Sequence, residues 1–167
     1  WTPAGADQRD PRLDELFAEL RAADRLESRT IELRIWAIWS EHADPMATAM
    51  LEQARIAMAG RAQDAARDVL DRLIAIQPAF AEAWNQRATL RWLANDPIGS
   101  LADIRQTLAL EPRHFGALAG MGLILMAENR DIAAARAFEA ALAVAPWLPG
   151  ARQNLEIIRA RAQGQSL

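Results

Sequence analysis

Apolar residues recur along this chain at intervals of three and four, the spacing that places side chains on one face of an α-helix. Leu13, Leu16, Phe17 and Leu20 form the first such stripe. Asp-Pro pairs, such as Asp44 with Pro45, are typical of a helix cap followed by the first helical residue. Together these signals predict nine helices, over residues 11–25, 28–42, 45–59, 62–76, 79–94, 97–110, 113–128, 131–145 and 149–163.

The helical pattern repeats along the chain with one period. Pro78, Pro112 and Pro146 are each 34 residues apart. Two further series share this period and phase: Ala66, Ser100 and Ala134, and Leu70, Ile104 and Phe138. Three series in one register indicate stacked helical hairpins, since a single hairpin cannot cover its own apolar face.

The motifs inside this period resemble those of the tetratricopeptide repeat (TPR) family. The best match lies in residues 113–146, with Leu118, Met121, Gly122, Leu125, Ala134, Phe138 and Pro146 at signature positions. Small residues there let two helices approach closely, and large ones fill the space between them. The repeat over residues 79–112 has the signature tryptophan, Trp84, but Arg87, Ala88 and Arg91 replace Leu, Gly and Tyr.

The resemblance implies an all-α, right-handed solenoid of about nine helices. The predicted parts are a disordered lead (1–10), one TPR domain (11–163) and a tail (164–167). Within the domain we expect a degenerate hairpin (11–44), repeats over 45–78, 79–112 and 113–146, and a capping helix (149–163). The repeat over 45–78 is weak, and its Gly60 is one residue off register, so its turn is expected to differ.

Composition excludes several classes of function. The chain has 51% hydrophobic residues, too many for a disordered polymer, and a net charge of −3, which does not favour nucleic acid. It has no Cys, Tyr or Lys, so all 19 basic residues are Arg. The two histidines, His42 and His114, lack metal-ligand spacing, and the glycines near Gly120 lie within a helix instead of a phosphate loop. We therefore predict no catalytic residue, cofactor or metal, and no membrane-inserted segment.

In the TPR family the first helix of each hairpin lines a concave surface, which implies a set of candidate binding residues. By repeat register these are Leu51, Arg55, Met58, Asn85, Thr89, Trp92, Ala119, Leu123 and Met126. Such an apolar stripe suits a hydrophobic ligand, although each residue could instead belong to the core. Some TPR domains hold a C-terminal carboxylate with paired Lys and Asn; without Lys this is not expected here.

Three tryptophans have alternative roles. Trp147, in a loop, is either a docking anchor or a staple between the last hairpin and the capping helix, and we favour the staple. Trp36 and Trp39 lie on a strongly apolar helix and are expected in the core.

The favoured function is a protein–protein interaction adaptor that binds a protein or peptide through the apolar concave groove. The alternative is a self-associating structural scaffold of the cell envelope, and a homo-oligomer stays open. The run from Glu111 to Leu118 resembles that of small exported alphaproteobacterial TPR proteins, which implies a periplasmic or envelope location, with cytoplasm as the alternative. The start at Trp1 leaves open whether a signal peptide or membrane anchor preceded it.

Overall fold

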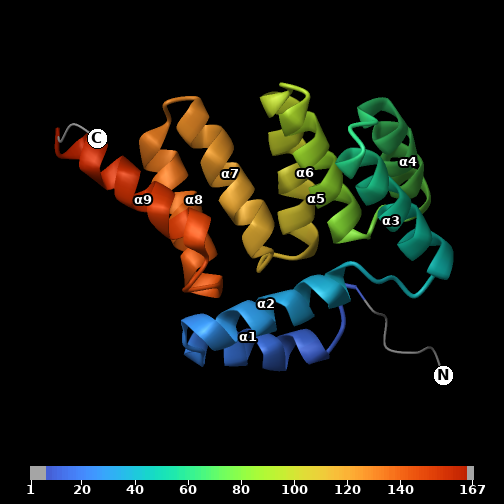
Figure 1. Cartoon of the computed structure of the whole chain (residues 1–167), viewed down its shortest axis with the longest axis horizontal. Coiled ribbons are helices and arrows are strands. Elements are labelled where there is room, and N and C mark those ends of the chain that lie inside the picture. Colours follow the sequence, from blue (N-terminus) through green and yellow to red (C-terminus); the bar gives the residue numbers. More distant parts are fainter. Residues whose placement is uncertain (1–6, 165–167) are drawn as a thin grey trace.

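The computed structural model describes residues 7–164, and within them the chain forms nine α-helices and no strand (Figure 1). The helices are α1 (Arg12–Ala22), α2 (Arg25–Trp39), α3 (Pro45–Ala59), α4 (Gln63–Ile76), α5 (Ala81–Leu93), α6 (Pro97–Leu110), α7 (Phe115–Ala127), α8 (Asp131–Val144) and α9 (Pro149–Ala162). All nine predicted helices are present. The largest difference is at α2, which begins and ends three residues earlier than predicted, because Asp24 and Glu27 form a capping box at its start.

Three antiparallel hairpins, α3–α4, α5–α6 and α7–α8, stack side by side, and α9 packs on the last of them (Figure 1). The repeated positions form the packing inside each hairpin. Phe138 on α8 is fully buried, and a Cβ atom added at Gly122 would lie 2.6 Å from its ring. Leu155 and Ile158 of α9 cover the same core, as expected for a capping helix. The fold is the solenoid of stacked helical hairpins that the period predicts.

The three turns inside the hairpins share one geometry, which corrects the expectation of a different turn at Gly60. The left-handed position is taken by Arg61 (φ 59°), Asn95 (φ 61°) and Asn129 (φ 58°), again 34 residues apart. Each turn closes with a backbone bond across six residues; in the first, Ala62 N donates to Ala57 O at 2.8 Å. Gly60 itself has a φ of −79°, so its offset does not alter the turn.

Arg61→Gly is therefore expected to stabilise the protein. A branched or long side chain in the left-handed region is strained, and glycine adopts that region without a Cβ penalty. The free energy of unfolding should rise by roughly 0.5–1 kcal/mol in urea denaturation, because relief of about 1–2 kcal/mol of Cβ strain exceeds the conformational entropy that glycine loses on folding. Gly60→Ala, next to it at a φ that any residue adopts, is the control and should not destabilise the turn. A lower stability for Arg61→Gly would contradict the assigned turn.

The hairpin α1–α2 does not extend the stack beside α3. It lies across the lower ends of the repeats, roughly perpendicular to their helices (Figure 1). Its apolar stripe, including Phe17, Ile35 and Trp39, packs against Phe115 at the start of α7 and Ala145 at the end of α8. The sequence pattern predicts this hairpin as a degenerate unit of the solenoid. In the structure it instead covers the turns between repeats.

Residues 7–10, which the pattern assigns to a disordered lead, are packed against the repeats. Gln8 Nε2 donates to Ala79 O at 2.6 Å, and Gln8 Oε1 accepts from Ala81 N at 3.2 Å. Asp10 accepts from Arg12, and this hydrogen bond holds the pKa of Asp10 below its ordinary value. The predictions for residues 1–6 and 165–167 lie outside the described residues.

None of the helices in residues 7–164 combines the length and apolar character needed to cross a bilayer.

Candidate functional site

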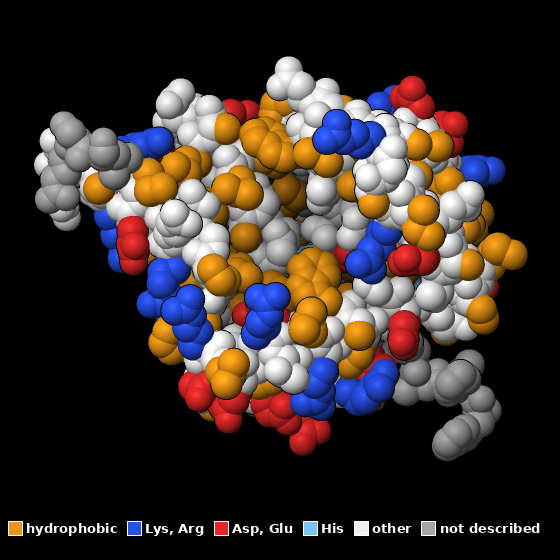
Figure 2. Space-filling model, viewed as in Figure 1, with side chains coloured by type: hydrophobic (Ala, Val, Ile, Leu, Met, Phe, Trp, Pro, Cys, Tyr) orange, Lys and Arg blue, Asp and Glu red, His pale blue; other side chains and the backbone are white. Residues whose placement is uncertain are grey.

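A cavity of about 260 Å³ lies between α5, α6 and α7. Figure 2 shows a hollow in the middle of the face in view, between α5 and α7, and hydrophobic side chains line it. Its walls are mostly apolar, and none of the lining residues is charged. They are Asn85, Ala88, Thr89 and Trp92 of α5, Ser100 and Ile104 of α6, and Gly116, Ala117, Ala119, Gly120, Leu123 and Ile124 of α7.

The structure brings five of the nine candidate residues to this cavity: Asn85, Thr89, Trp92, Ala119 and Leu123. They come together because residues three and four apart share one helix face. Trp92 is half-buried against the core between α5, α6 and α7, and Leu123 is 44% exposed. The cavity therefore combines an apolar wall with an accessible mouth.

The other four candidates do not line this cavity. Leu51 is only 1% exposed and belongs to the core of the α3–α4 hairpin, against which Met58 also packs. Arg55 is exposed and pairs with Glu52 at 3.9 Å. Met126 packs on the core formed by α7, α8 and α9. Register alone cannot tell a groove residue from a core residue.

The glycines of α7 have two different roles, although the sequence assigns all of them to close packing. A Cβ at Gly116 would lie 2.7 Å from the Trp36 ring, and one at Gly122 would meet Phe138, so both allow close approach. At Gly120, by contrast, the nearest atom would be Ile104 Cδ1 at 3.6 Å. Gly120 lines the cavity, and its missing side chain helps to create the space.

A buried polar cluster closes the end of the cavity near Asn85. Glu82, 1% exposed, accepts hydrogen bonds from Asn85 Nδ2 at 3.1 Å, Gln86 Nε2 at 2.6 Å and His114 Nε2 at 3.0 Å. His114 Nδ1 accepts from Ala117 N at 3.1 Å, so the proton on its ring is on Nε2. The carboxylate is also in the first turn of α5, where the helix dipole favours negative charge. The sequence pattern does not reveal this cluster because His114 is on the repeat that follows the repeat of Glu82.

Aromatic rings connect this cluster to the α1–α2 hairpin. His114 stacks on Trp39 with ring centroids 4.1 Å apart and planes at 9°. Trp36 meets His114 edge-on at 5.3 Å and Phe115 at 5.5 Å. Trp39 is buried as predicted, whereas Trp36 is only partly buried. The N-terminal hairpin therefore supports the end of the cavity where α7 begins.

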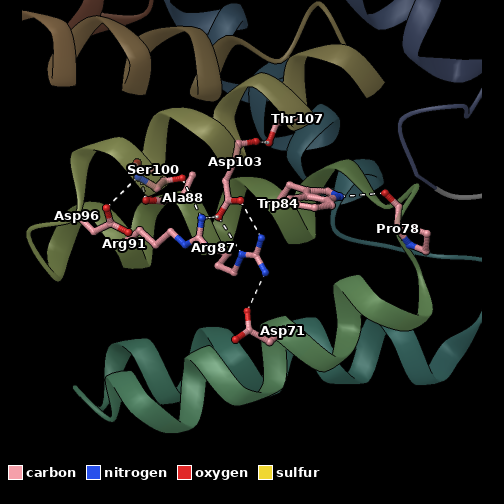
Figure 3. A network of polar contacts seen from close by, with 11 residues as sticks. Asp71, Pro78, Trp84, Arg87, Ala88, Arg91, Asp96, Ser100, Asp103 and Thr107 are labelled. Carbon is pink, nitrogen blue, oxygen red and sulfur yellow. Dashed lines mark hydrogen bonds and ion pairs between the residues drawn. The ribbon is translucent and has the colours of Figure 1, made fainter.

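Ion pairs fix the opposite face of α5, and they involve the residues that depart from the TPR signature (Figure 3). Arg87 donates twice to the buried Asp103, at 2.9 and 2.8 Å, and once to Asp71 at 2.8 Å. Arg91 lies 3.2 Å from the same Asp103. The hydrogen bonds to Asp103 raise the pKa of Arg87 above its ordinary value, against the desolvation that burial causes.

Trp147 joins the last turn of the repeats to the N-terminal hairpin. Its Nε1 donates to Ala23 O at 3.0 Å, and the Arg152 guanidinium lies 4.9 Å from its ring. The staple that the sequence favoured is therefore present, and it reaches the α1–α2 turn as well as α9.

Comparison with known proteins identifies the family. No family model matches the chain. A TPR repeat-containing protein of Rhizobium etli is 34% identical over 156 residues, which cover 92% of this chain and 76% of that protein. The chain belongs to the tetratricopeptide repeat family, and this relative comes from an alphaproteobacterium, as the resemblance implied.

Solved structures show the same fold. The first TPR of Spaghetti, bound to the HSP90 peptide SRMEEVD, superposes with a TM-score of 0.67 over 70% of this chain and 93% of that one, at 18% identity. The TPR domain of Sgt2 from Aspergillus fumigatus gives a TM-score of 0.66 over 71% of this chain and 80% of that one, at 17% identity.

Proposed function

We propose that this protein is an adaptor that binds an apolar segment of another protein or peptide in the cavity between α5, α6 and α7. The uncharged, mostly apolar wall of this cavity carries the proposal. At about 260 Å³ it is slightly below the ~300–1,000 Å³ of ordinary small-molecule sites, and it suits one large side chain that anchors a peptide. The peptide bound to the TPR of Spaghetti supports a peptide ligand in general.

The proposed apolar ligand differs in chemistry from the peptide that is bound to the TPR of Spaghetti. The peptide SRMEEVD ends in acidic residues, whereas no Arg lines the cavity described here and the chain has no Lys. The described residues that line the cavity include no histidine or carboxylate.

Gly120→Leu should fill the cavity without disturbing the fold. Its Cβ meets only Ile104 at an ordinary distance, and leucine is a better helix former than glycine. We expect a peptide selected against the parent from a random library to bind about 30-fold more weakly or worse, since a buried anchor contributes about 2 kcal/mol or more. Isothermal titration calorimetry measures the change.

The matched control is Gly150→Leu, the same substitution in the first turn of α9, where a Cβ meets nothing within 4 Å. It should leave the affinity for the peptide unchanged. Full affinity in Gly120→Leu, with melting unchanged, would exclude this cavity as the peptide site.

Self-association is the second candidate, and one observation favours it. Leu26 and Leu33, seven residues apart on α2, are 81% and 62% exposed on the hairpin. Large apolar side chains exposed on one helix could be covered by a second copy of the chain. Sedimentation should then show a dimer in the parent and a monomer in the Leu26→Glu/Leu33→Glu variant. The envelope location stays a prediction, which cell fractionation tests.

A further inference from the structure

Three polar side chains that line the cavity, those of Asn85, Thr89 and Ser100, each donate a hydrogen bond inside the protein. Asn85 Nδ2 donates to Glu82 Oε2 at 3.1 Å. Thr89 Oγ1 donates to Asn85 O at 3.1 Å, and Ser100 Oγ donates to Ala88 O at 2.7 Å. The two hydroxyls can therefore offer a ligand only oxygen acceptors, whereas Asn85 offers its Oδ1 and keeps one N–H of its amide.

The buried carboxylate sets the direction of the Asn85 amide. If the amide were turned over, Asn85 Oδ1 would face the oxygen of Glu82, which is an acceptor only. Glu82 is held in place by Gln86 and His114, and the His114 ring is locked by Ala117 N and by the stack on Trp39. Asn85 Oδ1 accepts no hydrogen bond from the residues that the structure describes, so it is available to the cavity that Asn85 lines.

Trp92 also lines the cavity and its indole N–H is a donor, but Trp92 lies at the end of the cavity away from Asn85. Trp92 follows Asn85 by seven residues on α5, which is two helical turns or roughly 10 Å along the axis. The Asn85 end consequently combines an apolar wall, a free carbonyl oxygen and a buried negative charge behind it. This combination repels a carboxylate and attracts an apolar group that carries a donor.

We propose that the cavity takes the side chain of a partner's tryptophan, with the indole N–H donated to Asn85 Oδ1. The inference rests on the proposed function and specifies its ligand. Indole combines a large apolar ring with a single N–H donor, which matches a mostly apolar wall with the free acceptor Asn85 Oδ1. The large apolar ring packs against the wall that Ile104 and Leu123 form. Glu82 and His114 are positioning residues, because they orient Asn85 without touching the ligand.

The test uses three blocked alanine pentapeptides with tryptophan, 1-methyltryptophan or phenylalanine at the centre. Chemical-shift titration of the Thr89, Gly120 and Leu123 amides reports binding in the cavity. We expect the tryptophan peptide to bind about tenfold more tightly than the 1-methyl peptide, because a site built around a hydrogen bond rejects an analogue that lacks the donor. The phenylalanine peptide should be similarly weak.

Two variants separate positioning from general stability. Asn85→Leu removes the acceptor and should bring the tryptophan and 1-methyl peptides to within about twofold of each other. Glu82→Gln lets the new amide donate to Asn85 Oδ1, so the Asn85 amide can turn and the preference should fall in the same way. Glu139→Gln, an exposed glutamate paired with Arg159, is the control and should keep the tenfold preference.

The outcomes are distinguishable. Equal binding of the tryptophan and 1-methyl peptides to the parent, with shifts in the cavity, would overturn the tryptophan inference and leave the adaptor function standing. No cavity shift with any of the three peptides would overturn both. If Glu82→Gln does not fold, the Asn85→Leu ratio decides, and a tenfold preference retained there would remove Asn85 from recognition.

Discussion

Gly122→Leu is expected to lower the free energy of unfolding by about 1–3 kcal/mol, the usual cost of overpacking a well-packed core. Even the first carbon of the new side chain would lie 2.6–2.7 Å from the ring of Phe138, which is fully buried and has no room to withdraw. Helix propensity acts in the opposite direction by up to ~1 kcal/mol, so the packing effect must exceed it. Urea denaturation followed by circular dichroism measures the balance.

Gly120→Ala, two residues away on the same helix, is the matched control. Its Cβ would meet Ile104 at an ordinary distance, so only the gain in helix propensity should be seen, up to ~1 kcal/mol. The two substitutions therefore have opposite expected signs. A Gly122→Leu protein that melts above the parent would show that the α7–α8 contact is looser than described.

Asp103→Ala is expected to lower the free energy of unfolding by roughly 3 kcal/mol, because it removes the shared partner of two arginines. Breaking a fully buried ion pair costs about 3–5 kcal/mol. The lower end applies here, since Arg87 can still reach Asp71 and Arg91 is partly exposed. Chemical denaturation of the variant beside the parent gives the difference directly.

The third repeat suggests a compensating variant. The positions 34 residues after Arg87, Arg91 and Asp103 hold Met121, Leu125 and Ala137, all apolar. The triple variant Arg87→Met/Arg91→Leu/Asp103→Ala should recover most of the stability lost in Asp103→Ala, since apolar packing can replace a buried ion cluster. A triple variant no more stable than Asp103→Ala would mean that the ions contribute something that packing cannot.

These ion pairs show which features of the packing the repeat signature predicts and which it does not. The substitution of Arg for Leu and Tyr at Arg87 and Arg91 is visible in the sequence as a departure. The carboxylates that pair with Arg87 cannot be recognised in the sequence, because Asp103 is on the next helix and Asp71 is on the preceding one. Each looks like an ordinary helix-surface carboxylate until the helices are packed.

The candidate binding residues also divide into those whose position follows from the sequence and those whose position depends on packing. Asn85, Thr89 and Leu123 could be placed by register, since helix periodicity alone sets which residues share a face. Leu51 has the same register but is buried, because the α3–α4 hairpin encloses that face of α3 in its own core. The role of Gly120 needed the position of Ile104 on another helix.

The sequence by itself determined the number of helices, the 34-residue period and the small positions such as Gly122, because each follows from spacings within one or two turns that then recur. Only the tertiary structure decided where the α1–α2 hairpin packs, since an amphipathic stripe such as Leu13 to Leu20 can cover any complementary apolar surface. It also decided the direction of the Asn85 amide. That direction depends on Glu82 and on His114, which is 32 residues away from Glu82 along the chain and is brought next to it by the stacking of two repeats.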